Sequence, residues 1–201
     1  PFATAKEIII GAAPVLASRI GYVGELGFEL HIPSEFAIHV YKELWQSGQE
    51  MDIANVGYRA IESLRMEKGY LYWSGDISPD YSPLEAGLGF RVHFDLKDDF
   101  LGRQALESQM KNGLDRKLFT FVSEQFLPLT GGETILESDR VVSLATSVAY
   151  GFTVKKTIVR GYLDRLYWGK TEFTVEVFGQ RYPVKLASSP VYDPKNLALK
   201  G

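Results

Sequence analysis

Cysteine is absent from this 201-residue chain, and only three histidines occur. The lack of cysteine excludes disulfides, thiolate metal sites and a cysteine nucleophile. The histidines, His31, His39 and His93, are too scattered to predict a zinc site. No apolar run approaches the roughly 18 residues that a membrane-spanning helix needs, so we expect no membrane partner.

A basic surplus is also missing. Lys+Arg 22 against Asp+Glu 25 gives a net charge of −3, whereas proteins that bind nucleic acid are normally basic, so we expect no nucleic-acid partner. Hydrophobic residues make up 45% and charged residues 23%, which excludes bulk disorder. Because the chain begins Pro1-Phe2 without methionine, we interpret it as a fragment of a longer polypeptide.

The first half of the chain mixes strand and helix patterns. Residues 28–32 alternate with period two, which predicts a strand with Glu29 and His31 on its polar face. Ser34 is the expected N-cap of a helix that ends near Gly48. Two further helices are predicted at Gly57–Lys68 and Leu101–Lys111, and the glycines of residues 82–90 suggest another strand start.

The second half contains short strand patterns at a spacing typical of an antiparallel barrel or sandwich. Residues 178–181 between the last two predict a hairpin with glycine at a positive φ. The predicted strands are Leu118–Val122, Val141–Ala145, Thr157–Tyr162, Phe173–Val177 and Tyr182–Leu186.

The change of pattern predicts two domains, residues 1–112 and 113–201, with the boundary near Gly113. The distribution of charge supports the same boundary, because the formal net charge of residues 1–110 is −7 and that of residues 111–201 is +4. We interpret this mainly as two docked modules with complementary surfaces.

No signature of catalysis is complete. Residues 169–171 end like a phosphate-binding loop, but Asp164 stands where its first glycine belongs. No dinucleotide-binding G-x-G-x-x-G or nucleophile G-x-S-x-G occurs. We therefore assign no catalytic residue and no metal ligand.

Gly21, Gly24 and Gly27 are spaced by three and are unsuited to a helix interior. They predict a tight turn that feeds the strand at 28–32 and allows a close backbone approach. Glu29 is then either a solvated strand residue or a carboxylate that accepts paired N–H donors from a flat heterocycle such as a pterin. The residues alone leave both interpretations open.

Three segments together resemble the glycine-cleavage T-protein (aminomethyltransferase) superfamily: Tyr22–Glu29, Ser63–Gly69 and Ser82–Leu88. Within it, Gly57–Tyr70 and the ending Ser189–Asn196 look closest to the sarcosine and dimethylglycine dehydrogenases. The resemblance implies an α+β fold, half of the T-protein folate-binding fold (an antiparallel sheet with helices) followed by an all-β C-terminal barrel. Residues 1–112 would be its second α+β folate-binding subdomain.

The resemblance also implies a ligand and partners. Tetrahydrofolate is the expected cofactor, with FAD in a missing upstream flavin domain; that domain and the missing first folate subdomain would belong to the same parent chain. Ile61 stands where aminomethyltransferases carry arginine, and Phe90 where the dimethylglycine type has tyrosine. The positions that match folate-binding residues are Tyr22, Glu29, Leu30, His31 and Phe90.

The expected function is that of the tetrahydrofolate-binding, one-carbon-accepting part of a flavin-dependent sarcosine or dimethylglycine dehydrogenase, which forms 5,10-methylenetetrahydrofolate. The isolated chain is expected to be inactive toward the amine. A non-catalytic module similar to the regulatory subunit of pyruvate dehydrogenase phosphatase is one alternative. A folate-dependent aminomethyltransferase or demethylase is another. The resemblance implies the mitochondrial matrix for a eukaryotic protein and the cytoplasm for a bacterial one.

Overall fold

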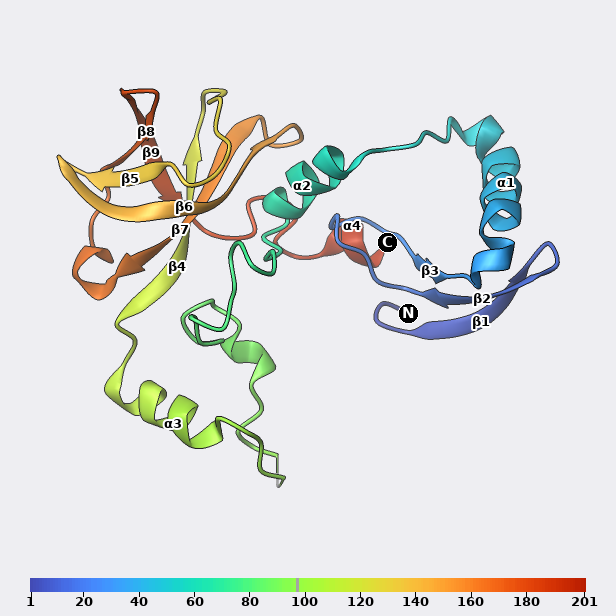
Figure 1. Ribbon diagram of the computed structural model, residues 1–201, viewed down its shortest axis with the longest axis horizontal. Coiled ribbons are helices and arrows are strands. Elements are labelled where there is room, and N and C mark those ends of the chain that lie inside the picture. Colours follow the sequence, from blue (N-terminus) through green and yellow to red (C-terminus); the bar gives the residue numbers. More distant parts are fainter. Residues whose placement is uncertain (97) are drawn as a thin grey trace.

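The computed structural model describes residues 1–96 and 98–201. A small sheet with a helix lies at one end of the molecule and a closed barrel at the other (Figure 1). This confirms the predicted α+β fold with a C-terminal barrel. The strands are β1 (Ala5–Ile10), β2 (Ala13–Ser18), β3 (Glu29–His31), β4 (Arg116–Ser123), β5 (Thr134–Glu137), β6 (Arg140–Gly151), β7 (Lys156–Asp164), β8 (Phe173–Val177) and β9 (Gln180–Ala187). The helices are α1 (Ala37–Gly48), α2 (Tyr58–Glu67), α3 (Arg103–Asn112) and α4 (Leu197–Lys200).

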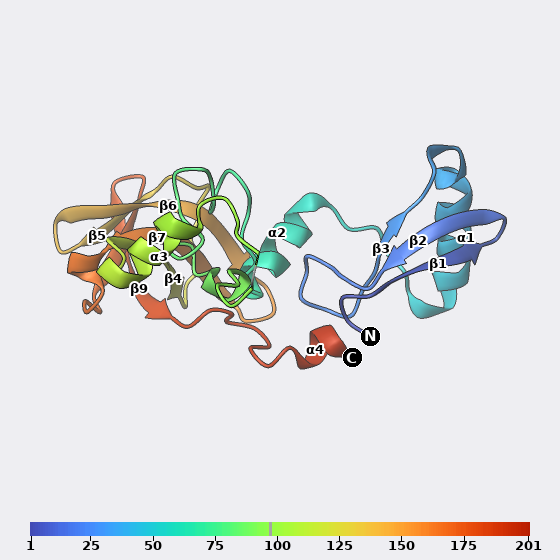
Figure 2. The same ribbon diagram turned by 90° about the horizontal axis from the view of Figure 1, so that it is seen from below.

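The small sheet is antiparallel in the order β1-β2-β3 and is covered on one face by α1 (Figures 1 and 2). Val15 of β2 and Val40 of α1 are buried together, with Leu30 of β3 packed against them. The other face carries Ile9 and Leu16, which are 69% and 40% exposed. Within the described ranges this second face, called the open sheet face below, therefore lies uncovered.

The barrel closes in the order β4-β7-β6-β5-β8-β9, with every pair antiparallel. Its interior is filled by inward side chains, including the fully buried Phe121, Ile135 and Val159. The β8–β9 hairpin turns through Phe178 and Gly179 at φ 49° and 76°, which confirms the hairpin that the glycine predicted.

Helix α2 joins the N-terminal part to the barrel. Ser63 Oγ donates to the Tyr150 carbonyl at 2.7 Å. The buried Glu67 carboxylate accepts the amides of Thr153 and Val154 at 2.7 and 3.0 Å. Gly151 leaves the space, because a Cβ there would lie 2.7 Å from the Glu67 carboxylate. Helix α2 is thus seated on the β6–β7 hairpin.

The C-terminal segment runs back from the barrel to the small sheet, so that α4 lies close to the N-terminus (Figures 1 and 2). The Arg19 guanidinium donates to the carbonyls of Leu199 and Lys200 at 3.3 and 3.2 Å. The Tyr192 hydroxyl donates to Glu25 at 2.6 Å. The segment therefore ties the two ends of the molecule together.

Two local predictions are wrong. Ser34 is not an N-cap: it begins a 3₁₀ turn at Ser34–Phe36, whose N-cap is Pro33, and no side chain caps it. Residues 82–87 form a turn instead of a strand start. There the Ser82 hydroxyl accepts the Glu85 amide at 3.1 Å, while the Glu85 carboxylate accepts the Ser82 amide at 2.8 Å. This reciprocal capping arrangement explains the Ser-x-x-Glu spacing.

Candidate functional site

The glycine-spaced segment is a loop between β2 and β3, and one of its glycines is structurally required. Gly24 has φ 80°, and a Cβ there would lie 2.6 Å from the Lys68 side chain. A Cβ at Gly21 would meet nothing within 4 Å, and one at Gly27 only a backbone oxygen at 3.9 Å. The predicted close approach is therefore confirmed at Gly24, where the backbone of the loop lies against Lys68 at the end of α2.

Tyr22 is fixed in this loop by two contacts. Its ring stacks on Tyr70 with centroids 5.8 Å apart, and its hydroxyl donates to the Leu71 carbonyl at 2.6 Å. Burial raises the pKa of Tyr22 above its ordinary value. The hydroxyl thus stays protonated at neutral pH, and its proton is committed to the backbone.

Glu29 and His31 lie on the open sheet face. Glu29 is the first residue of β3, opposite Ser18, and His31 lies opposite Leu16. Both side chains are exposed, and within the described residues the Glu29 carboxylate has no hydrogen bond or ion pair. Leu30 is on the other face, in the apolar cluster under α1. Two of the three predicted β3 residues therefore share a surface, and Leu30 does not.

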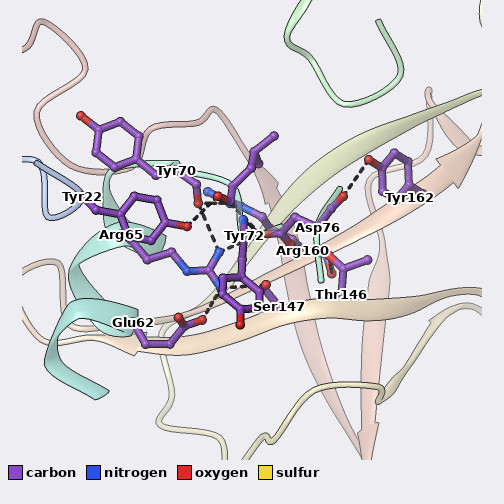
Figure 3. Close-up of polar contacts among 11 residues, drawn as sticks. Tyr22, Glu62, Arg65, Tyr70, Tyr72, Asp76, Thr146, Ser147, Arg160 and Tyr162 are labelled. Atoms are coloured by element: carbon purple, nitrogen blue, oxygen red, sulfur yellow. Dashed lines mark hydrogen bonds and ion pairs between the residues drawn. The ribbon is translucent and has the colours of Figure 1, made fainter. Parts of the chain in front are cut away.

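A buried ionic cluster lies between α2 and the barrel (Figure 3). Asp76, fully buried, accepts Arg65 Nη1 at 2.7 Å and Arg160 Nη1 at 3.3 Å. Its carboxylate also accepts the Tyr72 amide at 3.0 Å and the Thr146 hydroxyl at 2.7 Å. This cluster joins three parts of the chain: α2, the loop that follows it, and strands β6 and β7.

The two arginines of this cluster have different surroundings. Arg65 has a second carboxylate, since its Nη2 donates to Glu62 and also to Ser147 at 2.8 Å. Burial lowers the pKa of Arg65, but its hydrogen bond to the Glu62 carboxylate and the charge of Asp76 raise it, and the net pKa lies above its ordinary value. Burial lowers the pKa of Arg160 further than Asp76 raises it.

The surroundings of Asp76 stabilise its negatively charged form. Burial alone would raise the pKa of its carboxyl, but Arg160, the Thr146 hydroxyl, the Tyr72 amide and Arg65 lower it, and the net pKa is below its ordinary value. The Tyr162 hydroxyl donates to the Asp76 carbonyl at 2.8 Å. Asp76 is therefore ionised at neutral pH and anchors its loop on the barrel.

Phe90 lies on a different surface from Glu29. It is in the 3₁₀ turn Gly89–Arg91, is 70% exposed, and lines a cavity of about 760 Å³. This barrel-side cavity is lined by residues 68–71, 77, 86–88, 90, 117–120, 187, 189, 190, 194 and 196, with Arg160 in its wall. Tyr70 is another lining residue, and it stacks on Tyr22.

The structure thus brings the predicted site residues together in part. Glu29 and His31 share the open sheet face, whereas Phe90 lines the barrel-side cavity together with Tyr70, on which Tyr22 stacks. Asp76 and Arg160 were missed. Asp76 follows no periodic pattern, but Arg160 had a readable signal: it is a charged residue inside the apolar strand pattern Thr157–Tyr162.

The comparisons with known proteins match both parts of this architecture. The family model of the GCVT N-terminal domain covers residues 1–96, and that of the glycine cleavage T-protein C-terminal barrel domain covers residues 116–193. The chain belongs to the glycine-cleavage T-protein family. Aminomethyltransferase T of the glycine cleavage system from Bartonella henselae is a structural neighbour, with a TM-score of 0.79 and 25% identity. The similarity covers 88% of this chain and 49% of that one.

Two curated relatives of the T-protein family are longer proteins. Mitochondrial sarcosine dehydrogenase from Mus musculus is 38% identical over all of this chain, and mitochondrial dimethylglycine dehydrogenase from Homo sapiens is 34% identical over 94% of it. The chain spans only 23% and 22% of their lengths. Across residues 1–96 and 98–201, no helix has both the length and the apolar character needed to cross a bilayer.

Proposed function

We propose that this chain is the tetrahydrofolate-binding, one-carbon-accepting portion of a flavin-dependent enzyme related to sarcosine and dimethylglycine dehydrogenases. Its product would be 5,10-methylenetetrahydrofolate. The family membership and the similarity to these two dehydrogenases support the proposal. The flavin chemistry would be carried by an upstream part of the same parent polypeptide, since this chain has no dinucleotide fingerprint.

The observation that carries the proposal is the state of Glu29. Its carboxylate is exposed on the open sheet face and engages no described residue. Two free carboxylate oxygens match the paired donors on the edge of a pterin, an amino group beside a ring N–H, and such charge-assisted bonds are strong. An acceptor set without a partner of its own fits this ligand.

The surrounding residues divide the remaining work. His31 is two residues along β3 on the same face and would contact the ligand beside Glu29. Tyr22 has its hydroxyl proton committed to Leu71, so its contribution would be the aromatic ring. Leu30 faces the apolar cluster and would support the strand from behind. Phe90 would offer a ring to the ligand only where the ligand extends to the barrel.

Glu29→Gln tests the pterin contact. The variant keeps the side-chain shape but replaces one acceptor oxygen by a donor, which would face the ring N–H. Losing a charge-assisted pair and opposing two donors costs about 2–4 kcal/mol, roughly 30- to 1,000-fold in affinity. Calorimetric titration of the full-length parent polypeptide and its variant with tetrahydrofolate measures the change in affinity.

Glu7→Gln is the matched control. Glu7 is an exposed residue of β1 in the same sheet, opposite Leu16, which lies beside His31. Its variant should bind tetrahydrofolate within about twofold of the parent. Glu25 is a poorer control, because it accepts the Tyr192 hydroxyl. If Glu29→Gln also binds within twofold of the parent, the pterin contact is wrong. If the parent itself does not bind tetrahydrofolate, the non-catalytic regulatory alternative is favoured.

A further inference from the structure

The barrel-side cavity carries charge of one sign. Lys68, Lys117 and Arg160 are among the described residues that line it, and neither Asp nor Glu is among them. The Lys68 ammonium is already paired, donating to the Asp193 carboxylate at 2.8 Å. The positive charges of the other two have no carboxylate in the cavity wall, so the cavity attracts an anion.

Arg160 is the decisive residue. It is 1% exposed and lies on β7 opposite Thr120 of β4, another lining residue. Its Nη1 donates to the Tyr70 carbonyl at 2.6 Å and to Asp76 at 3.3 Å, whereas its Nη2 is buried with no hydrogen-bond partner. A buried guanidinium donor without an acceptor is unfavourable, and arginine cannot relieve this by losing its proton.

Asp76 serves two arginines, Arg65 and Arg160. Its single negative charge is shared with Arg65, which approaches it more closely, at 2.7 Å. Glu62 adds a second carboxylate, but on the Arg65 side. Arg160 therefore shares the charge of Asp76 with Arg65, and its Nη2 has no hydrogen-bond acceptor. A ligand carboxylate would supply that acceptor and add negative charge beside the guanidinium.

Most of the remaining lining residues are apolar, and the cavity is large enough for an aromatic ring. Its volume, about 760 Å³, is in the range of small-molecule sites. Mostly apolar walls with a small number of polar or charged groups are typical of small-molecule sites, so the ligand should carry a ring as well as an anion. The apolar lining residues include Leu71, Ile77, Leu88, Phe90, Phe119 and Pro190.

From these observations we infer that the barrel-side cavity binds an aromatic carboxylate, with its carboxylate on the Arg160 guanidinium and its ring against the apolar wall. The inference shares Phe90 with the proposed function, but it rests on Arg160 and does not require the Glu29 contact. The carboxylate could belong to a free aromatic acid or to the aminobenzoyl-glutamate part of a folate. The two sources share the chemistry, and the experiment separates them.

The test uses probes that contain no pterin. 4-Aminobenzoate is titrated into the ¹⁵N-labelled 201-residue chain, and its neutral isostere 4-aminobenzamide is titrated in parallel, with binding followed by amide chemical shifts. We expect the carboxylate to bind at least tenfold more tightly than the amide. The shifts should centre on residues 69–71 and 88–90.

Two variants locate the contact. Arg160→Met should weaken 4-aminobenzoate binding at least tenfold and leave 4-aminobenzamide binding unchanged. Arg181→Met is the matched control, since Arg181 is a barrel arginine paired with Asp139 and Glu176 and is absent from the cavity lining. If Arg160→Met does not fold, Phe90→Ala replaces it: loss of this exposed wall residue should weaken both probes about equally.

Three results would overturn the inference: amide and carboxylate binding within twofold of each other, shifts that map away from the cavity, or no saturable binding of 4-aminobenzoate. A further arm identifies the source. If 4-aminobenzoyl-glutamate binds more tightly than 4-aminobenzoate and tetrahydrofolate displaces it, a folate tail occupies the cavity. If tetrahydrofolate and 4-aminobenzoate bind together, the cavity serves a separate aromatic acid. Either result supports a carboxylate site that is independent of Glu29.

Discussion

Asp76→Asn is the most informative test of how the chain is held together. Asparagine keeps the size of the side chain and could still accept from Arg65 and the Tyr72 amide, but it removes the negative charge. Arg65 would retain Glu62, whereas Arg160 would lose its only ion-pair partner within the described residues. The variant therefore isolates the cost of one uncompensated buried guanidinium.

The structure sets the magnitude. Asp76, Arg65 and Arg160 are each at most 1% exposed, so solvent screens the lost charge poorly. Removing one partner of a buried ion pair costs about 3–5 kcal/mol. At a urea m-value of roughly 2 kcal/mol per M, the unfolding midpoint should fall by about 1.5–2.5 M. Equilibrium urea unfolding at pH 7 measures this shift.

A second substitution separates charge from packing. In the double variant Asp76→Asn/Arg160→Met, the uncompensated charge is gone and an apolar chain fills most of its volume. We expect it to be more stable than Asp76→Asn alone by about 1–3 kcal/mol. A midpoint shift under 0.5 M for the single variant, or a double variant less stable than the single one, would refute the reasoning.

The pH dependence gives an independent check. Because the folded pKa of Asp76 lies below its unfolded value, this group stabilises the fold above about pH 4. The contribution is lost as the pH falls through the lower folded pKa. The parent should therefore lose its stability advantage over Asp76→Asn when the pH is lowered from 6 to below 3. If the free energies of unfolding of the two proteins instead change in parallel over this range, the assignment is wrong.

Two further predictions concern the backbone. Gly24→Ala should destabilise the fold by about 1–3 kcal/mol, because φ is 80° and the Lys68 side chain would lie 2.6 Å from the added methyl group. Gly21→Ala is the control: the added methyl group would meet nothing within 4 Å, so the free energy of unfolding should change by at most about 0.5 kcal/mol. Thermal unfolding of both variants measures the difference. The domain boundary near Gly113 remains a prediction, and brief digestion with proteinase K tests it against the exposed linker 52–57. The contacts of α2 with the barrel favour a first cut at 52–57, whereas a first cut at 110–116 would support the sequence-based boundary.

The barrel was largely readable from the sequence because its strands are short runs of strand-forming residues. Buried and less buried residues alternate along β8, whereas residues 157–163 of β7 are all buried. Strand β5 was missed: Ile135 and Leu136 are both buried, and the register shifts between them, which removes the period-two signal. The β1–β2 hairpin was missed for a different reason. Pro14 lies within β2, a central strand, where proline is unexpected.

In the candidate site, too, the sequence predicted the features that follow from local alternation and not those that depend on tertiary packing. The strand that carries Glu29 and His31 follows from local alternation, so the sequence could place these two residues on one face. Their exposure could not be predicted, because it depends on which face α1 covers. Nor could local spacing bring Tyr22 beside Tyr70, since the contact requires the glycine loop to fold back over the end of α2.

The ionic cluster shows what kind of information local patterns lack. Arg65 had a visible neighbour, Glu62, three residues away on its helix, and that pair is present. The stronger constraint comes from Asp76 and Arg160, which are 84 residues apart. The chain offers 25 acidic residues as partners for Arg160, and only the closed barrel selects one. A charge inside an apolar strand therefore predicts that a partner exists, and the fold decides whether that partner is sufficient. At Arg160 it is not, because Asp76 is shared and Nη2 remains without an acceptor.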